Sequence, residues 1–296
     1  MATSGSTLAR RALGRQMHML RERAQVKQAE AARILGVSAQ TIGRLEDGQT
    51  TRPNDIFLNI LCNSYNASDT ERQTVLALAH EVRTTHKQGG GWWRGYAEAH
   101  MSTGFDHYLS LEESARSLTI WKTNLVPGLL QTPDYRRAIA WSQIPPLSQE
   151  SIEQRIQVVT KRQGRLDNPD FTMTALLSES VLKEQVGGPA VMLGQVHQLL
   201  RVAERDNVTV LVVPFAAPQH LGPLIGSFSF LEFAELPQSR VPEPPVVYVE
   251  EYAGDLYLEL EEDIERYRAA LTEIRRVALS EVESRNKILE AVEEYE

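Results

Sequence analysis

Long apolar runs and cysteines are both scarce in this chain of 296 residues. The longest apolar run, VTVLVVPFAAP at 208–218, is too short to span a bilayer and contains two prolines. The single cysteine, Cys62, excludes an internal disulfide and a cysteine-built zinc site, which suits a reducing cytosol. The basic N-terminal stretch lacks the continuous apolar region of a secretory signal peptide. We therefore expect a cytoplasmic protein that has no membrane partner.

The sequence also lacks the motifs of common enzyme classes. It contains no GxSxG elbow, no GxxxxGK[ST] phosphate loop, no HExxH zinc motif and no Cys–His pair in a recognisable context. The carboxylates of residues 250–265 are interpreted as a solvated face, because charge runs usually are. We predict no catalytic residue, no metal site and no cofactor, and we predict that the protein is not an enzyme.

Charge is divided unevenly along the chain, whose formal net charge is -8. Residues 1–53 carry nine Lys/Arg and four Asp/Glu, a balance of +5, whereas residues 232–296 carry seven against eighteen, a balance of -11. The value for the whole chain therefore says little about either half. An acidic protein of this kind can still present a basic surface near its N-terminus.

Two domains of different class are expected from the pattern of elements. Residues 1–87 predict an all-α domain of five helices, and KQGGGWWRG at 87–95 contains three consecutive glycines that predict a linker over 88–95. Residues 96–296 predict a larger α+β domain with a mixed sheet, whose strand order the sequence does not give. Within it, residues 105–122 look helical, and helices and strands then alternate to the end of the chain.

The segment QAEAARILGVSAQTIGRLEDGQTTRP, residues 28–53, has the pattern of a helix-turn-helix. A helix over Gln28–Leu35 ends at Gly36, and Ser38 is suited to cap a second helix over Ala39–Asp47. Small or apolar residues stand wherever two crossing helices must touch, namely at Ala31, Ala32, Leu35, Val37, Ile42 and Leu45. Because several independent conditions are met at fixed spacing, this signal is specific. A protein-docking module remains the alternative.

Roles in DNA binding follow from this geometry, because the second helix of such a motif enters the major groove by its N-terminal end. Glutamine pairs with adenine and arginine with guanine, while small side chains contact the thymine methyl group. We predict base contacts from Ala39, Gln40, Thr41 and Arg44. We predict phosphate contacts from Arg15, Lys27, Gln28, Ser38 and Arg52. The other basic residues of the first helix, Arg10, Arg11, Arg21 and Arg23, are expected to form a solvated face.

The stretch LGRQMHMLRERAQVKQAEAARILGVSAQTIGRLEDGQTTRP resembles the Xre/Cro-type helix-turn-helix of bacterial repressors. The remainder, through VPGLLQTPDYRRA, LSESVLKEQVGG and NVTVLVVPF, resembles the C-terminal domain of unknown function in a large actinobacterial regulator family. That resemblance implies base reading by Gln40, Thr41 and Arg44, and a small partner protein encoded nearby, as in toxin–antitoxin pairs. The chain departs from the family at Gly43, where relatives usually have serine, and at Ala31, where they usually have leucine.

The sequence therefore predicts a transcriptional regulator that binds operator DNA as a homodimer and associates with the nucleoid. Its larger domain is expected to bind a small partner protein or a ligand and to provide dimerisation. An antitoxin-like interaction protein, whose DNA binding serves only autoregulation, is the alternative.

Overall fold

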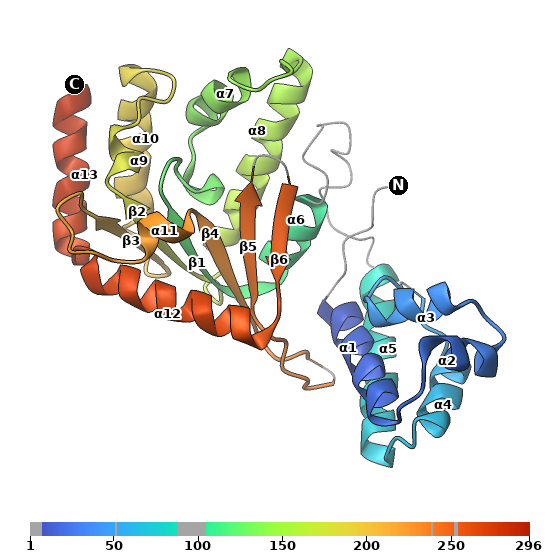
Figure 1. Ribbon diagram of the computed structural model, residues 1–296. Coiled ribbons are helices and arrows are strands. Elements are labelled where there is room, and N and C mark those ends of the chain that lie inside the picture. Colours follow the sequence, from blue (N-terminus) through green and yellow to red (C-terminus); the bar gives the residue numbers. More distant parts are fainter. Residues whose placement is uncertain (1–7, 51, 88–104, 238, 252–253) are drawn as a thin grey trace. The chain divides into compact units, whose positions relative to one another are not determined.

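The computed structural model describes residues 8–50, 52–87, 105–237, 239–251 and 254–296 (Figure 1). These residues divide into two compact units, which are described separately below. The first unit contains residues 8–87 together with 105–114 and 233–243. The second contains residues 115–232 and 244–296. The linker expected at 88–95 lies outside the described residues, so the proposed domain boundary stays a prediction.

The first unit is built from helices, as predicted. Its five N-terminal helices are followed by a sixth, and their bounds are α1 Leu8–Arg23, α2 Gln28–Leu35, α3 Ala39–Glu46, α4 Asp55–Ser64, α5 Asp69–Lys87 and α6 Phe105–Ser114. Leu13, Leu20 and Leu61 lie in one buried cluster that joins α1 to α4. Cys62 is buried in the same cluster as a free thiol.

Local capping chemistry sets most of these helix ends. Ser68 stands before α5, and its hydroxyl accepts a hydrogen bond from the backbone of Glu71 at 3.3 Å. Pro53 is suited to a first helical position, yet the fourth helix begins two residues later, at Asp55. Asn54 is its N-cap, because the Asn54 side chain accepts hydrogen bonds from the backbone N–H groups of Ile56 and Phe57. Proline supplies the preferred φ of a first helical position but no such acceptor.

The second unit contains a six-stranded mixed sheet, which confirms the α+β prediction. The strand order is β3-β2-β1-β4-β5-β6. Strands β1, β2 and β3 are parallel, whereas β5 is antiparallel to both β4 and β6. The strands are β1 Ala115–Lys122, β2 Thr172–Ser178, β3 Val208–Val213, β4 Phe228–Phe233, β5 Val246–Glu251 and β6 Gly254–Leu258.

Helices and short 3-10 turns connect and cover these strands (Figure 1). They are η2 Gly128–Leu130, α7 Pro133–Trp141, α8 Gln149–Gln163, η3 Gly164–Asp167, α9 Ser180–Lys183, α10 Pro189–Val202, α11 Gly222–Ile225, α12 Glu261–Val277 and α13 Glu281–Tyr295. At the start of α7 the Thr132 side chain caps the helix, and Pro133 follows as its first residue. Ser148 caps α8 in the same way.

The prediction of a helix over 105–122 is correct for its first part and wrong for its second. Only α6, Phe105–Ser114, is helical, and residues 115–122 form β1. This strand lies between β2 and β4, and Leu118 and Ile120 are buried on one side of it while Trp121 is buried on the other. A strand buried on both faces has no clear alternation of apolar and polar residues, so its sequence does not separate it from a helix.

Both faces of the sheet are covered. On one face Trp121, Leu176 and Phe230 form a cluster with Ile264 and Ile274 of α12. Strand residues whose side chains point to the other face of the sheet are also buried. The exposed fraction of the residue is 3% for Ile120, 0% for Leu177 and 0% for Val212. At the β3 edge, Val212 N–H donates to the Ser284 hydroxyl of α13, which satisfies an edge donor that would otherwise be unpaired.

Candidate nucleic-acid interface

The two helices of the predicted motif form with the tight turn that the sequence indicated. Gly36 ends α2 with a φ of 66°, a left-handed conformation that glycine adopts without strain. The backbone N–H of Val37 then donates to the Ala32 carbonyl at 3.0 Å. Ser38 caps α3, because its hydroxyl accepts a hydrogen bond from Thr41 N–H at 3.2 Å.

The four predicted base-reading residues share the exposed side of α3. Ala39, Gln40, Thr41 and Arg44 are all exposed. Ile42, on the opposite side of the helix, is only 1% exposed and packs into the core of the unit. No ion pair or hydrogen bond of the Arg44 side chain occurs within the described part of the chain. The side chain is therefore available to a base edge.

The carboxylate of one residue, Glu46, connects α3 to α1 and α2 by hydrogen bonds. Glu46 accepts hydrogen bonds from Arg21 Nε at 2.6 Å and Arg21 Nη2 at 2.9 Å, and from Gln28 Nε2 at 2.9 Å. Its Oε2 atom also lies 3.1 Å from His18 Nδ1. The Glu46 side chain is 4% exposed. Burial alone raises the pKa of this carboxyl, but the hydrogen bonds from Arg21, Gln28 and His18 outweigh burial and lower it.

The predicted phosphate contacts fall into two groups in the structure. Lys27, Ser38 and Arg52 are exposed, and Lys27 immediately precedes α2. The amide of Gln28 is instead bound to Glu46, and Arg15 Nη1 donates to Glu243 Oε1 at 3.1 Å. Exposure makes the first group the stronger candidates for the DNA backbone. The phosphate-contact roles of all five residues remain predictions.

The expectation of a solvated basic face on α1 is wrong for three of its four residues. Arg10, Arg11 and Arg21 are 4%, 6% and 5% exposed, because α1 packs against α3 and α5. Arg23 alone is exposed, and it pairs with Glu71 at 2.6 Å. The spacing of basic side chains along a helix does not show whether other parts of the chain pack over them, so their burial could not be predicted.

Residues 233–243, which follow β4, belong to this first unit and supply several of these partners. Leu236 is part of its apolar core, and the Ser239 N–H donates to Glu81 Oε1 at 2.8 Å. Glu243 is fully buried and lies 3.6 Å from Arg11 Nε. Because these residues lie more than 150 positions from their partners along the chain, no local sequence pattern could have identified the contacts.

Helix α2, the Gly36 turn and the exposed face of α3 define a helix-turn-helix domain, which indicates a DNA-binding regulator. Residues 12–75 match the model of a helix-turn-helix domain family. Residues 105–290 match a second model, described as a domain of unknown function, DUF5753. This match covers more than half of the chain, which therefore belongs to the DUF5753 family.

Neither the curated proteins nor the solved structures contain a significant match to the chain. None of the helices in the described ranges has the length and apolar character needed to cross a membrane. Within the same ranges, no group of three or more histidine, cysteine or acidic side chains is placed to hold a metal ion.

Proposed function

We propose that the protein is a sequence-specific transcriptional regulator that reads operator DNA with α3. The observation that carries this proposal is the placement of Gln40, Thr41 and Arg44 on the exposed side of a helix anchored by buried Ile42. Gln can pair with adenine through one donor and one acceptor, whereas Arg can pair with guanine through two donors, so the two side chains distinguish these bases in the major groove. The exposed positions of Lys27 and Arg52 support backbone contacts beside it.

We further infer that the regulator acts on nucleoid DNA in the cytoplasm as a homodimer of the Xre/Cro type. Motifs of this class read half-sites about one helical turn apart, which matches a two-fold axis between protomers. The larger unit would then provide dimerisation and bind a ligand or a small partner protein.

The first prediction concerns salt dependence of DNA binding by the full chain. If each protomer contacts about three phosphates, log K should fall against log salt with a slope of roughly -5 for the dimer. Fluorescence anisotropy with a site selected from genomic DNA, measured from low to high salt, gives the slope. A scrambled duplex of equal length is the control. Equal affinity for both duplexes, or an affinity independent of salt, would refute sequence-specific binding by this protein.

The second prediction separates base reading from backbone contact. Arg44→Ala should cost ~1–3 kcal/mol on the selected site and relax the preference at one base pair, because the lost guanidinium specifies a base. Arg52→Ala should weaken all sequences alike and reduce the salt slope by about one contact. Both side chains are exposed, so neither substitution disturbs the core.

Competition experiments with a library of single-base variants distinguish these two effects. If Arg52→Ala changed base preference while Arg44→Ala did not, α3 would not be the recognition helix.

A further inference from the structure

A cavity of about 310 Å³ lies at the carboxyl ends of two parallel strands in the second unit. Ser178 and Val213, the last residues of β2 and β3, both line it. The loop over 214–227, which connects β3 to β4 and contains α11, provides the other lining residues. In open α/β sheets, ligands commonly bind beyond the carboxyl ends of the strands. The cavity therefore lies where such a sheet places its ligand sites.

Contacts with the sheet and its helices hold this loop in place. The Phe215 N–H donates to Glu179 Oε2 at 2.8 Å, and Glu179 Oε1 lies 3.0 Å from Lys287 Nζ of α13. Farther along the loop, the indole N–H of buried Trp121 donates to the Gly222 carbonyl at 3.3 Å. A Cβ atom at Gly222 would stand 2.6 Å from the Trp121 ring, so glycine allows the loop to lie this close. The walls of the cavity are therefore fixed before a ligand arrives.

The lining of the cavity is mostly apolar. It includes Phe215, Ala217, Leu224 and the three prolines of the loop. Phe215 and Leu224 are 66% and 77% exposed, so large apolar side chains face solvent where the cavity opens. None of the described residues that line the cavity is lysine, arginine, aspartate or glutamate. Because an ion would lose hydration there without gaining an opposite charge, this lining favours an uncharged ligand.

His220 gives the cavity a fixed hydrogen-bond donor. Burial lowers the pKa of His220, and the charge of Arg276 adds to this effect, so the ring is neutral near pH 7. Its Nδ1 atom accepts a hydrogen bond from the Gly222 N–H at 3.1 Å. The proton of the neutral ring is therefore on Nε2, which has no hydrogen-bond partner among the described residues. The Ser178 hydroxyl is already bonded to that of Ser180, at 2.7 Å.

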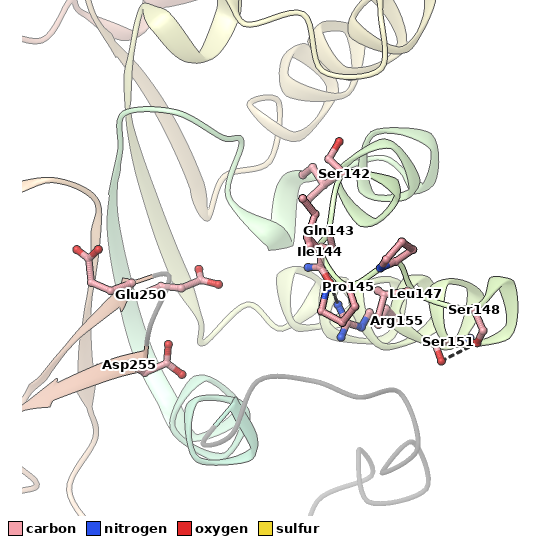
Figure 2. Close-up of a pocket in the computed structure, with 13 residues that line it drawn as sticks. Ser142, Gln143, Ile144, Pro145, Leu147, Ser148, Ser151, Arg155, Glu250 and Asp255 are labelled. Carbon is pink, nitrogen blue, oxygen red and sulfur yellow. Dashed lines mark hydrogen bonds between the residues drawn. The ribbon is translucent and has the colours of Figure 1, made fainter.

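The larger cavity of the same unit, about 910 Å³, has a different character. Arg155, Glu250, Glu251 and Asp255 are among its lining residues. Figure 2 shows Arg155 on the helical side and Glu250 and Asp255 on the side formed by the strands. Charged side chains hold water in such a space, which disfavours a neutral apolar molecule. This cavity therefore serves as the internal comparison for the smaller one.

We propose that the cavity of about 310 Å³ binds a small, uncharged molecule with an apolar body and a hydrogen-bond acceptor, which the Nε2–H group of His220 recognises. The volume is near the lower limit of ligand pockets, roughly 300 Å³, so the ligand has about the size of one substituted ring. This inference rests on the proposed ligand-binding role of the larger unit, and it names the chemical class of the ligand.

The experiment is a ligand-observed NMR titration of the full chain at pH 7.5 with three probes of similar shape: acetophenone, ethylbenzene and benzoate. We expect saturable binding of acetophenone, which is uncharged and carries a carbonyl acceptor. Ethylbenzene lacks the acceptor and should bind about three- to tenfold more weakly. Benzoate should bind at least about tenfold more weakly, because its charge has no partner in the lining. A tighter complex with benzoate would contradict an uncharged ligand.

Two substitutions locate the binding site. Phe215→Ser should weaken acetophenone binding by about fivefold or more, because it removes an apolar wall of the cavity. The Tm should stay close to that of the original chain, since the side chain is largely exposed. His220→Phe keeps a ring but removes the donor, so acetophenone and ethylbenzene should then bind equally. If this variant does not fold, Phe215→Ser and the three probes still decide the outcome.

Ile144→Ser is the matched control, because Ile144 is also an exposed apolar residue but lines the larger cavity. It should leave acetophenone binding unchanged. The proposal is overturned if acetophenone does not bind saturably, if ethylbenzene binds as tightly, or if Ile144→Ser weakens binding and Phe215→Ser does not. Operator binding is measured without these probes, so such a failure leaves the proposed DNA-binding function untouched.

Discussion

Glu46→Ala is expected to lower the free energy of unfolding of the helix-turn-helix unit by about 3–5 kcal/mol. The substitution removes the buried carboxylate that pairs with Arg21, whose side chain is 6% exposed, and leaves that charge with the exposed Glu22 as its remaining acidic partner. It also releases the Gln28 amide, so that α1, α2 and α3 lose their common polar contact. Chemical denaturation monitored by circular dichroism measures the loss.

The pH dependence of stability has a definite sign for this group. The pKa of Glu46 is lowered in the folded protein, so the stabilising contribution is fully present above the unfolded value of about 4.3. It is lost as the pH falls below that value through the folded pKa. The stability difference between the original chain and Glu46→Ala should therefore shrink in acid. A difference that stayed constant across this range would show that the carboxylate is not the cause.

Two further variants isolate the buried pair. Glu22 also contacts Arg21, at 2.6 Å, but its side chain is 56% exposed, so Glu22→Ala should cost less than about 1 kcal/mol. The double substitution Arg21→Met with Glu46→Met should recover much of the loss, because apolar side chains replace a buried ion pair at little cost. If the double variant were as unstable as Glu46→Ala, packing and not charge would explain the effect.

The sequence predicted the helix-turn-helix well because the relevant signals are local. Helix α2 runs over Gln28–Leu35 as expected, since its apolar spacing, Gly36 and Ser38 all lie within a few residues. Helix α13 has equally local signals, because Ser280 and Glu283 form a capping box at its start. In both cases periodicity and caps indicate the same boundaries, and no distant contact changes them.

Distant contacts account for what the sequence did not reveal. No local pattern distinguishes Glu46 from the other polar residues of α3, but Arg21 of α1, 25 positions away, binds it. Strand β1 was mistaken for a helix because its pairing partners, β2 and β4, are remote in sequence. The exposure of the residues predicted to read bases required none of this information.

Gly14→Ala is expected to destabilise the helix-turn-helix unit by about 3 kcal/mol, although alanine is the better helix former. Gly14 lies in the middle of α1, where α3 crosses it. A Cβ atom there would stand 2.3 Å from the Glu46 carbonyl oxygen and 2.8 Å from that of Leu45. Both are backbone atoms, so α1 and α3 must separate to admit the methyl group.

Gly43→Ala is the matched control, because it makes the same chemical change on α3, the proposed recognition helix. Its Cβ would meet only Gln28 Oε1, at 3.9 Å, which is ordinary contact. Relief of the glycine penalty should then raise the free energy of unfolding by about 1 kcal/mol. The denaturation midpoints of the two variants should therefore shift in opposite directions from that of the original chain. Gly14→Ala should also weaken operator binding, because α3 is displaced. If both substitutions stabilised the unit, α1 and α3 would not approach as closely in solution as this packing requires.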